Sequence, residues 1–374
     1  MRRPSIPWIK DNYVVAGLMS GTSLDGLDMV LCEIQRGSGE WTYHIIAAQT
    51  APYPDQIKEQ LATAQFMDGL QLCHLHNTFG DFLGLQVHEF LSDQKAPCDL
   101  IASHGHTIFH RPDQGLTLQV GNGLQIAYRT GISTVFDFRS QDVTLGGQGA
   151  PLVPIGDRLL FTEYDYCLNL GGFSNISYEE EGRRLAFDPS PVNFIINHCM
   201  QPVGEPYDKD GQTARSGTLH GELLNALNAL DYYQKKGPKS LGREWVETDF
   251  LPVLDRYKLP LKDQLRTIYE HIAIQISNSL NSFEKGRILV TGGGVYNIFL
   301  LELLTRRLLH KVIIPPSEII DYKEALIFAL LGVLRFREET NCLASVTGAC
   351  QDHSSGMIAH PYPGNLAEAG DKKY

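Results

Sequence analysis

The sequence of 374 residues contains no apolar run as long as the roughly 18 residues that a helix needs to cross a bilayer. Its opening residues, MRRPSIPWIKD, also lack the apolar core of a signal peptide. A basic surplus is missing as well, since the net charge is −11, and this argues against binding to nucleic acids or anionic membranes. We therefore expect a soluble, cytoplasmic protein whose partners are neither nucleic acids nor membranes.

Motifs with fixed cysteine or glycine spacing are absent too. The seven cysteines are scattered, odd in number and free of the C-x-x-C pattern, which is typical of reduced thiols in a cytoplasm. No G-x-x-x-x-G-K-[ST] occurs, so a P-loop is excluded. The triple glycine at 292–294 does not fit G-x-G-x-x-G, which gives little support to a dinucleotide-binding fold.

What the chain does contain is an alternation of strand-like and helix-like segments. Residues 13–19 (YVVAGLM) and 27–34 (LDMVLCEI) are short and apolar, as strands are. Residues 165–178 (DYCLNLGGFSNISY) repeat the order of strand, glycine turn and strand, and residues 287–308 run from a strand through three glycines into an amphipathic helix. Residues 265–283 have helical apolar spacing. The pattern predicts an α/β protein with two related lobes around a cleft.

The stretch GLMSGTSLDGLD between the first two strands has glycine, hydroxyl and acidic residues but no lysine or arginine. Gly21 and Gly26 permit a tight turn whose backbone N–H groups can bind an anion, and Thr22 and Ser23 add hydroxyl donors. Asp25 would repel a bare phosphate, so a phosphate ligand here implies Mg²⁺ held by that carboxylate through water. The loop is thus a candidate site for a magnesium nucleotide. The same residue types are common in ordinary hairpin turns, and the loop alone leaves both interpretations open.

Histidines gather in SHGHTIFH, which places His104 and His106 on one side of a strand and His110 further along. One interpretation is a metal site, to which CHLH at 73–76 could contribute. No carboxylate or cysteine completes a local ligand set, which disfavours that interpretation. We expect instead the polar wall of a pocket at a strand end, with His104 hydrogen-bonded to a ligand hydroxyl.

Asp188 ends a strand in RRLAFDPSPVNFIINH, directly before a helix whose start is marked by Pro189 and Pro191. It could cap that helix, which is the more common role of aspartate at such a position. It could also be a general base at the mouth of a cleft, where partial burial raises the pKa of a carboxyl group.

Taken together, these stretches resemble the bacterial anhydro-N-acetylmuramic acid kinases over nearly the whole chain, from Gly17 to about Pro361. The motifs that carry the resemblance are MSGTSLDG (19–26), SHGHT (103–107), TLQVGNGLQIAYRTG (117–131), DFRSQDVTLGGQGAPLVP (137–154), LNLGGFSNIS (168–177), YDKDG (207–211), VTGGGVYN (290–297) and SVTGA (345–349).

The resemblance implies the actin/hexokinase/Hsp70-type (ribonuclease H-like) architecture, with two lobes closing over ATP and a sugar. It also implies a reaction in which 1,6-anhydro-N-acetylmuramic acid, ATP and water give N-acetylmuramic acid 6-phosphate and ADP, a step of cell-wall recycling. Asp188 would take a proton from the water that opens the anhydro ring, and the released O6 would then attack the γ-phosphate. Phosphoryl transfer depends mainly on positioning and charge neutralisation, so a lysine in the loop is not required.

The resemblance implies a set of site residues, which are the positions of this sequence that match the family's motifs. The predicted nucleotide-binding residues are Gly21, Thr22, Ser23, Leu24, Asp25, Gly26, Leu27, Asp28, Gly171, Gly172, Gly292, Gly293, Gly294 and Asn297. The predicted sugar-binding residues are His104, Arg139 and Glu324. Asp188 is the predicted catalytic residue, and Asp25 is expected to hold Mg²⁺.

Three stretches of the sequence depart from the family pattern. The family usually has Asp-Thr-Gly-Pro where this chain has Asp188, Pro189, Ser190 and Pro191, and it usually has glutamine where this chain has His106. The pair of acids before the family's glutamate is reduced to DYKEA. We expect all three departures on the sugar side, so two alternatives stay open. One is a kinase of the same fold that acts on a simple sugar hydroxyl, and the other is an ATP-driven conformational switch without enzymatic activity.

For the domains, we expect a first lobe over residues 1–133 and a second over 134–339. A segment at about 340–360 is expected to pack back on the first lobe, and 361–374 is expected to be a loose tail. A homodimer is possible.

Overall fold

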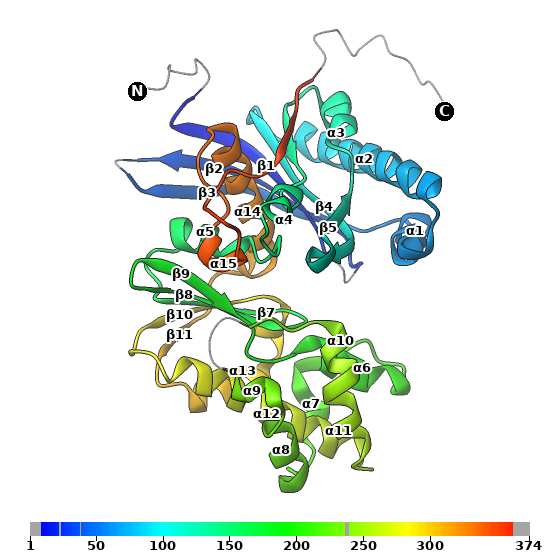
Figure 1. Cartoon of the computed structure of the whole chain (residues 1–374), viewed down its shortest axis with the longest axis vertical. Coiled ribbons are helices and arrows are strands. Elements are labelled where there is room, and N and C mark those ends of the chain that lie inside the picture. The colour runs from blue at the N-terminus through cyan, green and yellow to red at the C-terminus, as the bar shows by residue number, and fades with distance from the viewer. Residues whose placement is uncertain (1–8, 22–23, 38, 236–238, 362–374) are drawn as a thin grey trace. The chain divides into compact units, whose positions relative to one another are not determined.

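The computed structural model describes residues 9–21, 24–37, 39–235 and 239–361 (Figure 1). The chain divides into two compact units, of which unit 1 takes its residues from 1–160 and 322–374 and unit 2 from 161–321. The chain passes from unit 1 to unit 2 after α5 and returns within α14 (Ser317–Phe336). Each unit is built on one sheet.

The sheet of unit 1 has the strand order β12-β6-β4-β1-β2-β3, with β5 paired to β4. Strand β2 runs antiparallel to both of its neighbours, β1 and β3, whereas β4 runs parallel to β1 and β6 runs parallel to β4. The strand bounds are β1 (Asn12–Ser20), β2 (Leu27–Arg36), β3 (Trp41–Ala51), β4 (Leu100–Arg111), β5 (Leu116–Val120), β6 (Thr134–Phe136) and β12 (Met357–Ala359).

The sheet of unit 2 repeats this topology in the order β11-β10-β7-β8-β9. Strands β7, β8 and β9 are antiparallel, and β10 and β11 follow in parallel on the other side of β7. The strand bounds are β7 (Tyr166–Leu170), β8 (Ser174–Glu180), β9 (Arg183–Phe187), β10 (Arg287–Thr291) and β11 (Lys311–Ile313). A mixed sheet of order 3-2-1-4-5 with an antiparallel second strand is the ribonuclease H-like sheet. Its occurrence in both units confirms the predicted α/β class.

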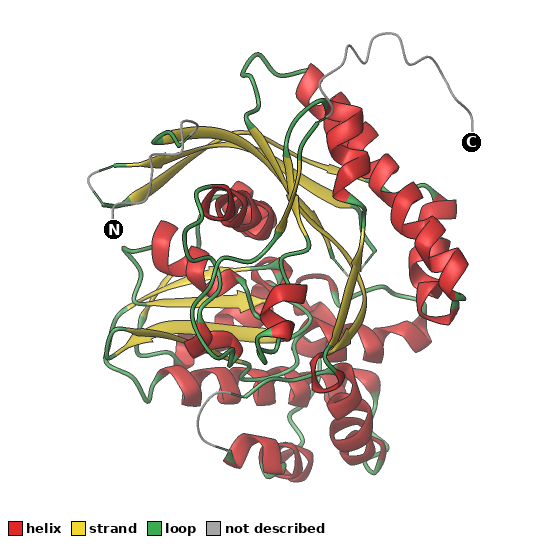
Figure 2. Cartoon of the chain, turned by 45° about the horizontal axis from the view of Figure 1, so that its top comes forward, coloured by secondary structure: helices red, strands yellow, loops and turns green. Residues whose placement is uncertain are grey.

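Helices cover both faces of the unit 1 sheet (Figure 2). An ideal Cβ on Gly17 of β1 would lie 2.0 Å from the carbonyl oxygen of Ala325 in α14, so the two backbones pack in direct contact. Leu18, the next residue of β1, points to the other face and joins the apolar cluster that α2 completes. The helices are α1 (Asp55–Thr63), α2 (Gly69–Ser92), α3 (Gly123–Thr130), α4 (Ser140–Thr144), α5 (Val153–Leu160) and α15 (Ala344–Thr347), with α14 as given above.

The core of unit 2 is formed by the sheet and by α12 (Leu261–Leu280), which buries Leu265, Ile268, Ile272 and Ile276 at helical spacing. This helix covers most of the segment predicted at 265–283. The remaining helices of the unit are α6 (Asn193–Met200), α7 (Gln212–Arg215), α8 (Gly221–Asn228), α9 (Asp231–Gln234), α10 (Arg243–Trp245), α11 (Leu251–Asp255) and α13 (Ile298–Arg307).

The unit boundaries differ from the expected ones. Residues 134–160 and 322–339, expected in the second lobe, belong to unit 1. The physical reason is strand pairing and helix packing, since β6 hydrogen-bonds to β4 and α14 packs on β1. The segment 340–360 also lies in unit 1, where β12 pairs with β6. Residues 362–374 of the expected tail lie outside the described residues. Within the part of the chain that the structure describes, no helix combines the length and apolarity of a membrane span.

Candidate active site

The loop between β1 and β2 carries the first group of predicted nucleotide-binding residues. Leu24 has a left-handed backbone (φ +60°), and its N–H donates to the carbonyl of Gly21 at 3.3 Å. A Cβ on Gly26 would lie 2.7 Å from the carbonyl oxygen of Ala51, so only glycine fits there. Asp25 is exposed on the loop. Thr22 and Ser23 lie outside the described residues, so their predicted contacts stay predictions.

Two hydrogen-bonded groups hold the ends of this loop. At its start, the Tyr53 hydroxyl donates to Ser20 Oγ at 2.6 Å, and Ser20 Oγ lies 2.8 Å from His106 Nδ1. At its end, Thr50 Oγ1 donates to Asp28 Oδ1 at 2.7 Å. Burial lowers the pKa of His106 to about 4, so the ring is neutral at physiological pH.

His106 was expected on the sugar side, and it bonds to Ser20, directly before the predicted phosphate loop. Its place relative to the sugar stays a prediction. Ser20, Tyr53 and Thr50 were not predicted, because their roles arise from pairings between strands that the local sequence does not reveal.

His104 and Arg139 form a pair in unit 1. Both Nε and Nη2 of Arg139 lie about 3 Å from His104 Nε2 (3.0 and 2.9 Å), and His104 Nδ1 lies 2.9 Å from the carbonyl oxygen of Gly105. Arg139 Nη1 also donates to the carbonyl of Gly149 at 2.6 Å. Burial, followed by the charge of Arg139, holds the pKa of His104 well below its usual value, so the ring is neutral.

The expectation that His104 bonds a ligand hydroxyl is therefore corrected. Both ring nitrogens are engaged within the protein, Nδ1 as donor to a carbonyl and Nε2 as acceptor from Arg139. What His104 can do in this arrangement is orient the guanidinium group.

Glu324 lies on α14 in a group of charged side chains of unit 1. Burial raises the pKa of its carboxyl group, the cations Lys323 and Arg139 counteract that rise, and Asp28 and Asp157 add to it. The predicted sugar-site residue Glu324 thus interacts electrostatically with Asp28, at the start of β2, and with Arg139, the other predicted sugar-site residue. A carboxylate and a guanidinium group close together can bind the hydroxyl and amide groups of a sugar.

A metal site built on the histidine stretch finds no support in the described residues. His104 faces Arg139, whereas His106 faces Ser20, and Gly105 between them has a left-handed backbone (φ +70°). The CHLH stretch lies on α2. The described residues that do group as possible metal ligands are Asp142, Cys342 and His353.

Asp188 follows β9 in unit 2, and both of its carboxylate oxygens accept hydrogen bonds. Asn175 Nδ2 donates to Oδ1 at 2.8 Å, and the Leu241 N–H donates to Oδ2 at 2.9 Å. Helix α6 starts at Asn193 with Val192 as its N-cap, so the helix-cap interpretation of Asp188 is wrong. Burial raises the pKa of Asp188, and the two hydrogen bonds partly offset the rise. A half-buried carboxylate held in this way is suited to accept a proton.

The glycine turns of unit 2 lie side by side. Because β7 and β10 are parallel neighbours, their carboxyl ends meet at one edge of the sheet. A Cβ on Gly292 would lie 2.5 Å from Asn169 Oδ1 and 2.9 Å from the carbonyl of Leu170, the residue before the turn at 171–172. The carbonyls of Gly171 and Gly172 accept from backbone N–H groups at the start of α6.

A cavity of about 450 Å³ opens beside these turns, within the size range of small-molecule sites. Gly293 and Asn297, both predicted, line it together with Asn193, Asp208 and Tyr296. Asn297 also caps α13 by accepting from the Leu300 N–H at 3.1 Å, and its Nδ2 donates to the Tyr269 hydroxyl at 2.6 Å. Asn193 and Asp208 were missed, although Asp208 lies in the YDKDG stretch that carried the resemblance.

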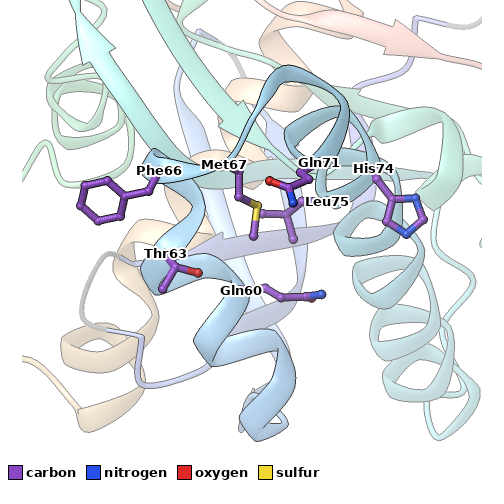
Figure 3. Close-up of a pocket in the computed structure, with 7 residues that line it drawn as sticks. All are labelled: Gln60, Thr63, Phe66, Met67, Gln71, His74 and Leu75. Atoms are coloured by element: carbon purple, nitrogen blue, oxygen red, sulfur yellow. The ribbon is translucent and has the colours of Figure 1, made fainter.

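A second hollow lies in unit 1 between α1, the short helix at Ala64–Phe66 and α2 (Figure 3). Its lining residues are Gln60, Thr63, Phe66, Met67, Gln71, His74 and Leu75. It contains none of the predicted site residues, and it offers no carboxylate for acid–base chemistry.

Two ribonuclease H-like sheets in one chain, with glycine turns at corresponding β1–β2 and β7–β8 connections, define the fold class of actin, hexokinase and Hsp70. The sequence profile of the family "Anhydro-N-acetylmuramic acid kinase" matches residues 13–361. The chain belongs to the anhydro-N-acetylmuramic acid kinase family, which confirms the predicted carbohydrate kinase.

Individual relatives agree with this assignment. The chain is 35% identical to the anhydro-N-acetylmuramic acid kinase of Hydrogenovibrio crunogenus, over 92% of this chain and 97% of that protein. It is 36% identical to the one of Aliivibrio fischeri, over 93% of this chain and 99% of that protein. Among solved structures, the activator of the 2-hydroxyisocaproyl-CoA dehydratase from Clostridium difficile aligns with a TM-score of 0.42 and 12% identity, over 87% of this chain and 96% of that one.

Proposed function

We propose that this protein uses ATP and water to convert 1,6-anhydro-N-acetylmuramic acid into N-acetylmuramic acid 6-phosphate and ADP, in the cytoplasm, as a step of cell-wall recycling. Family membership supports the substrate class. The observation that carries the chemistry is the position of Asp188, a half-buried carboxylate oriented by Asn175 and by the Leu241 N–H rather than used as a helix cap.

In the proposed reaction, Asp188 accepts a proton from the water that attacks the anomeric carbon of the sugar. The C1–O6 bond of the anhydro bridge breaks, and O6 becomes the nucleophile that takes the γ-phosphoryl group of ATP. Arg139, oriented by His104, and Glu324 bind the sugar. The proposed reaction needs a base and precisely positioned binding groups. The hydrogen bonds that hold Asp188 and Arg139 support this assignment.

For the nucleotide, we propose that the cavity beside Gly292–Gly294 and Asn297 binds ATP, with the turn at Gly171–Gly172 next to it. The β1–β2 loop would hold the phosphates through its backbone N–H groups. The loop has an exposed carboxylate, Asp25, and no basic residue, a donor set that fits hydrated Mg²⁺. Bound Mg²⁺ would neutralise phosphate charge during transfer.

A panel of sugars with ADP detection tests the proposal. We expect ADP formation with the anhydro sugar and little with glucose, N-acetylglucosamine or N-acetylmuramic acid. Turnover of a simple sugar at a higher rate would favour the simple-sugar kinase. ADP formation at the same rate with no sugar would favour the ATP-driven switch.

The variant Asp188→Asn tests the base. An amide has one acceptor oxygen, so one of the two hydrogen bonds is lost, at a cost of about 1 kcal/mol and a fall in melting temperature of roughly 2–4 °C. Turnover should fall at least about a hundredfold, because an amide cannot accept the proton. The matched control is Asp165→Asn, since Asp165 Oδ2 also accepts from a backbone N–H, that of Arg287 at 2.7 Å. Near-native turnover of Asp188→Asn would remove this residue from the mechanism.

A homodimer stays a prediction, and light scattering of the purified protein measures it directly.

A further inference from the structure

Unit 1 holds a group of side chains with metal-ligand chemistry that the proposed reaction does not use. Asp142, Cys342 and His353 each direct one ligand atom into a common space, and these atoms all lie within 4.8 Å of one another. All three residues are buried, with Cys342 2% exposed and His353 7% exposed. Asp142 is on α4, and the other two belong to the segment after α14.

The fold places Cys342 and His353 opposite each other. The Cys342 N–H donates to the His353 carbonyl at 3.0 Å, and the His353 N–H donates to the Cys342 carbonyl at 3.2 Å, which forms an antiparallel bridge. Residues paired in this way have their side chains on the same face, with Cβ atoms about 5 Å apart. The chain between them, including α15, returns so that both side chains face Asp142.

The hydrogen bonds of His353 fix which ring nitrogen faces the group. Nδ1 lies 3.1 Å from the carbonyl oxygen of Gln351, which can only accept, so Nδ1 carries the proton. In the neutral ring, Nε2 then presents a lone pair. Nε2 is buried without a hydrogen-bond partner and lies 3.5 Å from Asp142 Oδ1. Two buried electron-rich atoms that face each other require a cation between them or a second proton on the ring.

Asp142 is held by other groups in the way that metal-binding carboxylates are. Thr347 Oγ1 donates to Oδ1 at 2.7 Å, and the Gly149 N–H donates to Oδ2 at 2.7 Å. In a tetrahedral zinc site, with ligand bonds of about 2.0–2.3 Å, neighbouring ligand atoms are roughly 3.3–3.6 Å apart. The distance between His353 Nε2 and Asp142 Oδ1 falls in that range.

We propose that Asp142, Cys342 and His353 bind a zinc ion, with water as the fourth ligand, and that the ion fastens the segment after α14 to α4. Thiolate, imidazole and carboxylate ligands together suit zinc better than magnesium or calcium, which prefer oxygen. The Cys342 thiol loses its proton to solvent when the ion binds, so one proton is released per ion. Burial raises the pKa of this thiol, and a coordinating metal overcomes that rise.

The test uses the full-length protein, first stripped with a chelator and then titrated with Co²⁺ as a spectroscopic substitute for zinc. In the variant Cys73→Ser/Cys350→Ser, which lacks the two exposed cysteines, we expect one equivalent of Co²⁺ to bind. Binding should give a thiolate-to-cobalt charge-transfer band and the strong visible bands of four-coordinate cobalt. Zinc should displace the cobalt and raise the melting temperature by at least about 3 °C.

Two further variants locate the ion. Cys342→Ser and His353→Gln should each lose the charge-transfer band or weaken Co²⁺ affinity at least about tenfold, and each should lose the thermal shift with zinc. If the variant without exposed cysteines shows no band, the proposal is wrong and His353 and Asp142 form an ion pair instead. A band that persists in Cys342→Ser would equally contradict it, because the thiolate would come from another cysteine.

Discussion

Asp188 owes its expected activity to burial and to two neighbours, which together set the pKa of its carboxyl group. Burial raises the pKa, while the Asn175 side chain and the Leu241 N–H lower it. Because only the ionised carboxylate accepts a proton, kcat/KM should fall on the acid side with an apparent pKa above the 3.8 of an ordinary aspartate.

Replacing Asn175 by leucine tests this assignment. The variant Asn175→Leu removes the donor to Oδ1, so the pKa of Asp188 should rise and the acid limb of the kcat/KM profile should move to higher pH. The matched control is Asn12→Leu, which removes a similar bond to Glu33 Oε1 (2.7 Å) in unit 1 and should leave the profile unchanged. An unshifted acid limb in Asn175→Leu would show that another group controls it.

We propose that His104 is a positioning residue that acts through Arg139, to which it is hydrogen-bonded. In His104→Leu, the Nε and Nη2 groups of Arg139 lose their acceptor, and we expect the KM for the sugar to rise about tenfold while the KM for ATP stays constant. His104→Gln keeps an acceptor oxygen and should recover most of the loss. Steady-state kinetics on both variants measures the effect, and equal sugar KM values in wild type and His104→Leu would rule out this role.

At the scale of elements, the turns between strands carry the proposed nucleotide site. Gly292 and Gly204 both have left-handed backbones, with φ of +85° and +78°. A Cβ at Gly204 would meet nothing within 4 Å, whereas one at Gly292 would collide with the end of β7. Gly204→Ala should therefore cost about 1–2 kcal/mol through backbone strain alone.

Gly292→Ala should cost more than Gly204→Ala and should also raise the KM for ATP at least about tenfold, because the end of β7 must shift. Thermal melting and ATP kinetics on the two variants measure both effects. The same loss of ATP binding in both variants would mean that the turn at Gly292 has no special part in the site.

The β1–β2 loop is tested by Asp25→Asn. Asp25 is exposed, so the substitution should leave the melting temperature near that of the wild type. If the carboxylate holds Mg²⁺, the variant should need at least about tenfold more Mg²⁺ for half-maximal turnover. A wild-type Mg²⁺ dependence would place the metal elsewhere.

Local elements of the fold could be predicted from the sequence, whereas contacts between distant residues could not. The strands and glycine turns at 13–34, 165–178 and 287–308 were predictable, because apolar runs and turn glycines are local signals. The partners of the candidate site were not, since Leu241 follows Asp188 by 53 residues and His104 precedes Arg139 by 35. The predicted boundary between the units was wrong for the same reason, because the pairing of β6 with β4 places β6 in unit 1.

At the scale of the whole molecule, the proposed reaction joins two steps in one enzyme, the opening of the anhydro ring and the transfer of a phosphoryl group. Family membership makes the chain a sugar kinase, and the proposal adds that water opens the anhydro ring in the same turnover. A simple sugar kinase with the same base would deprotonate a hydroxyl group, so the loss of activity in Asp188→Asn cannot separate the two reactions. The origin of the oxygen at C1 of the product distinguishes the two reactions.

The most direct measurement is mass spectrometry of the sugar product formed from ATP and 1,6-anhydro-N-acetylmuramic acid in ¹⁸O-labelled water. We expect a phosphorylated sugar with one solvent ¹⁸O at C1 and the original oxygen in the phosphate ester at O6. Unlabelled N-acetylmuramic acid 6-phosphate, kept in the same water for the same time, corrects for exchange at C1. A phosphorylated product that carries no solvent oxygen, or ADP formed without any phosphorylated sugar, would contradict the account.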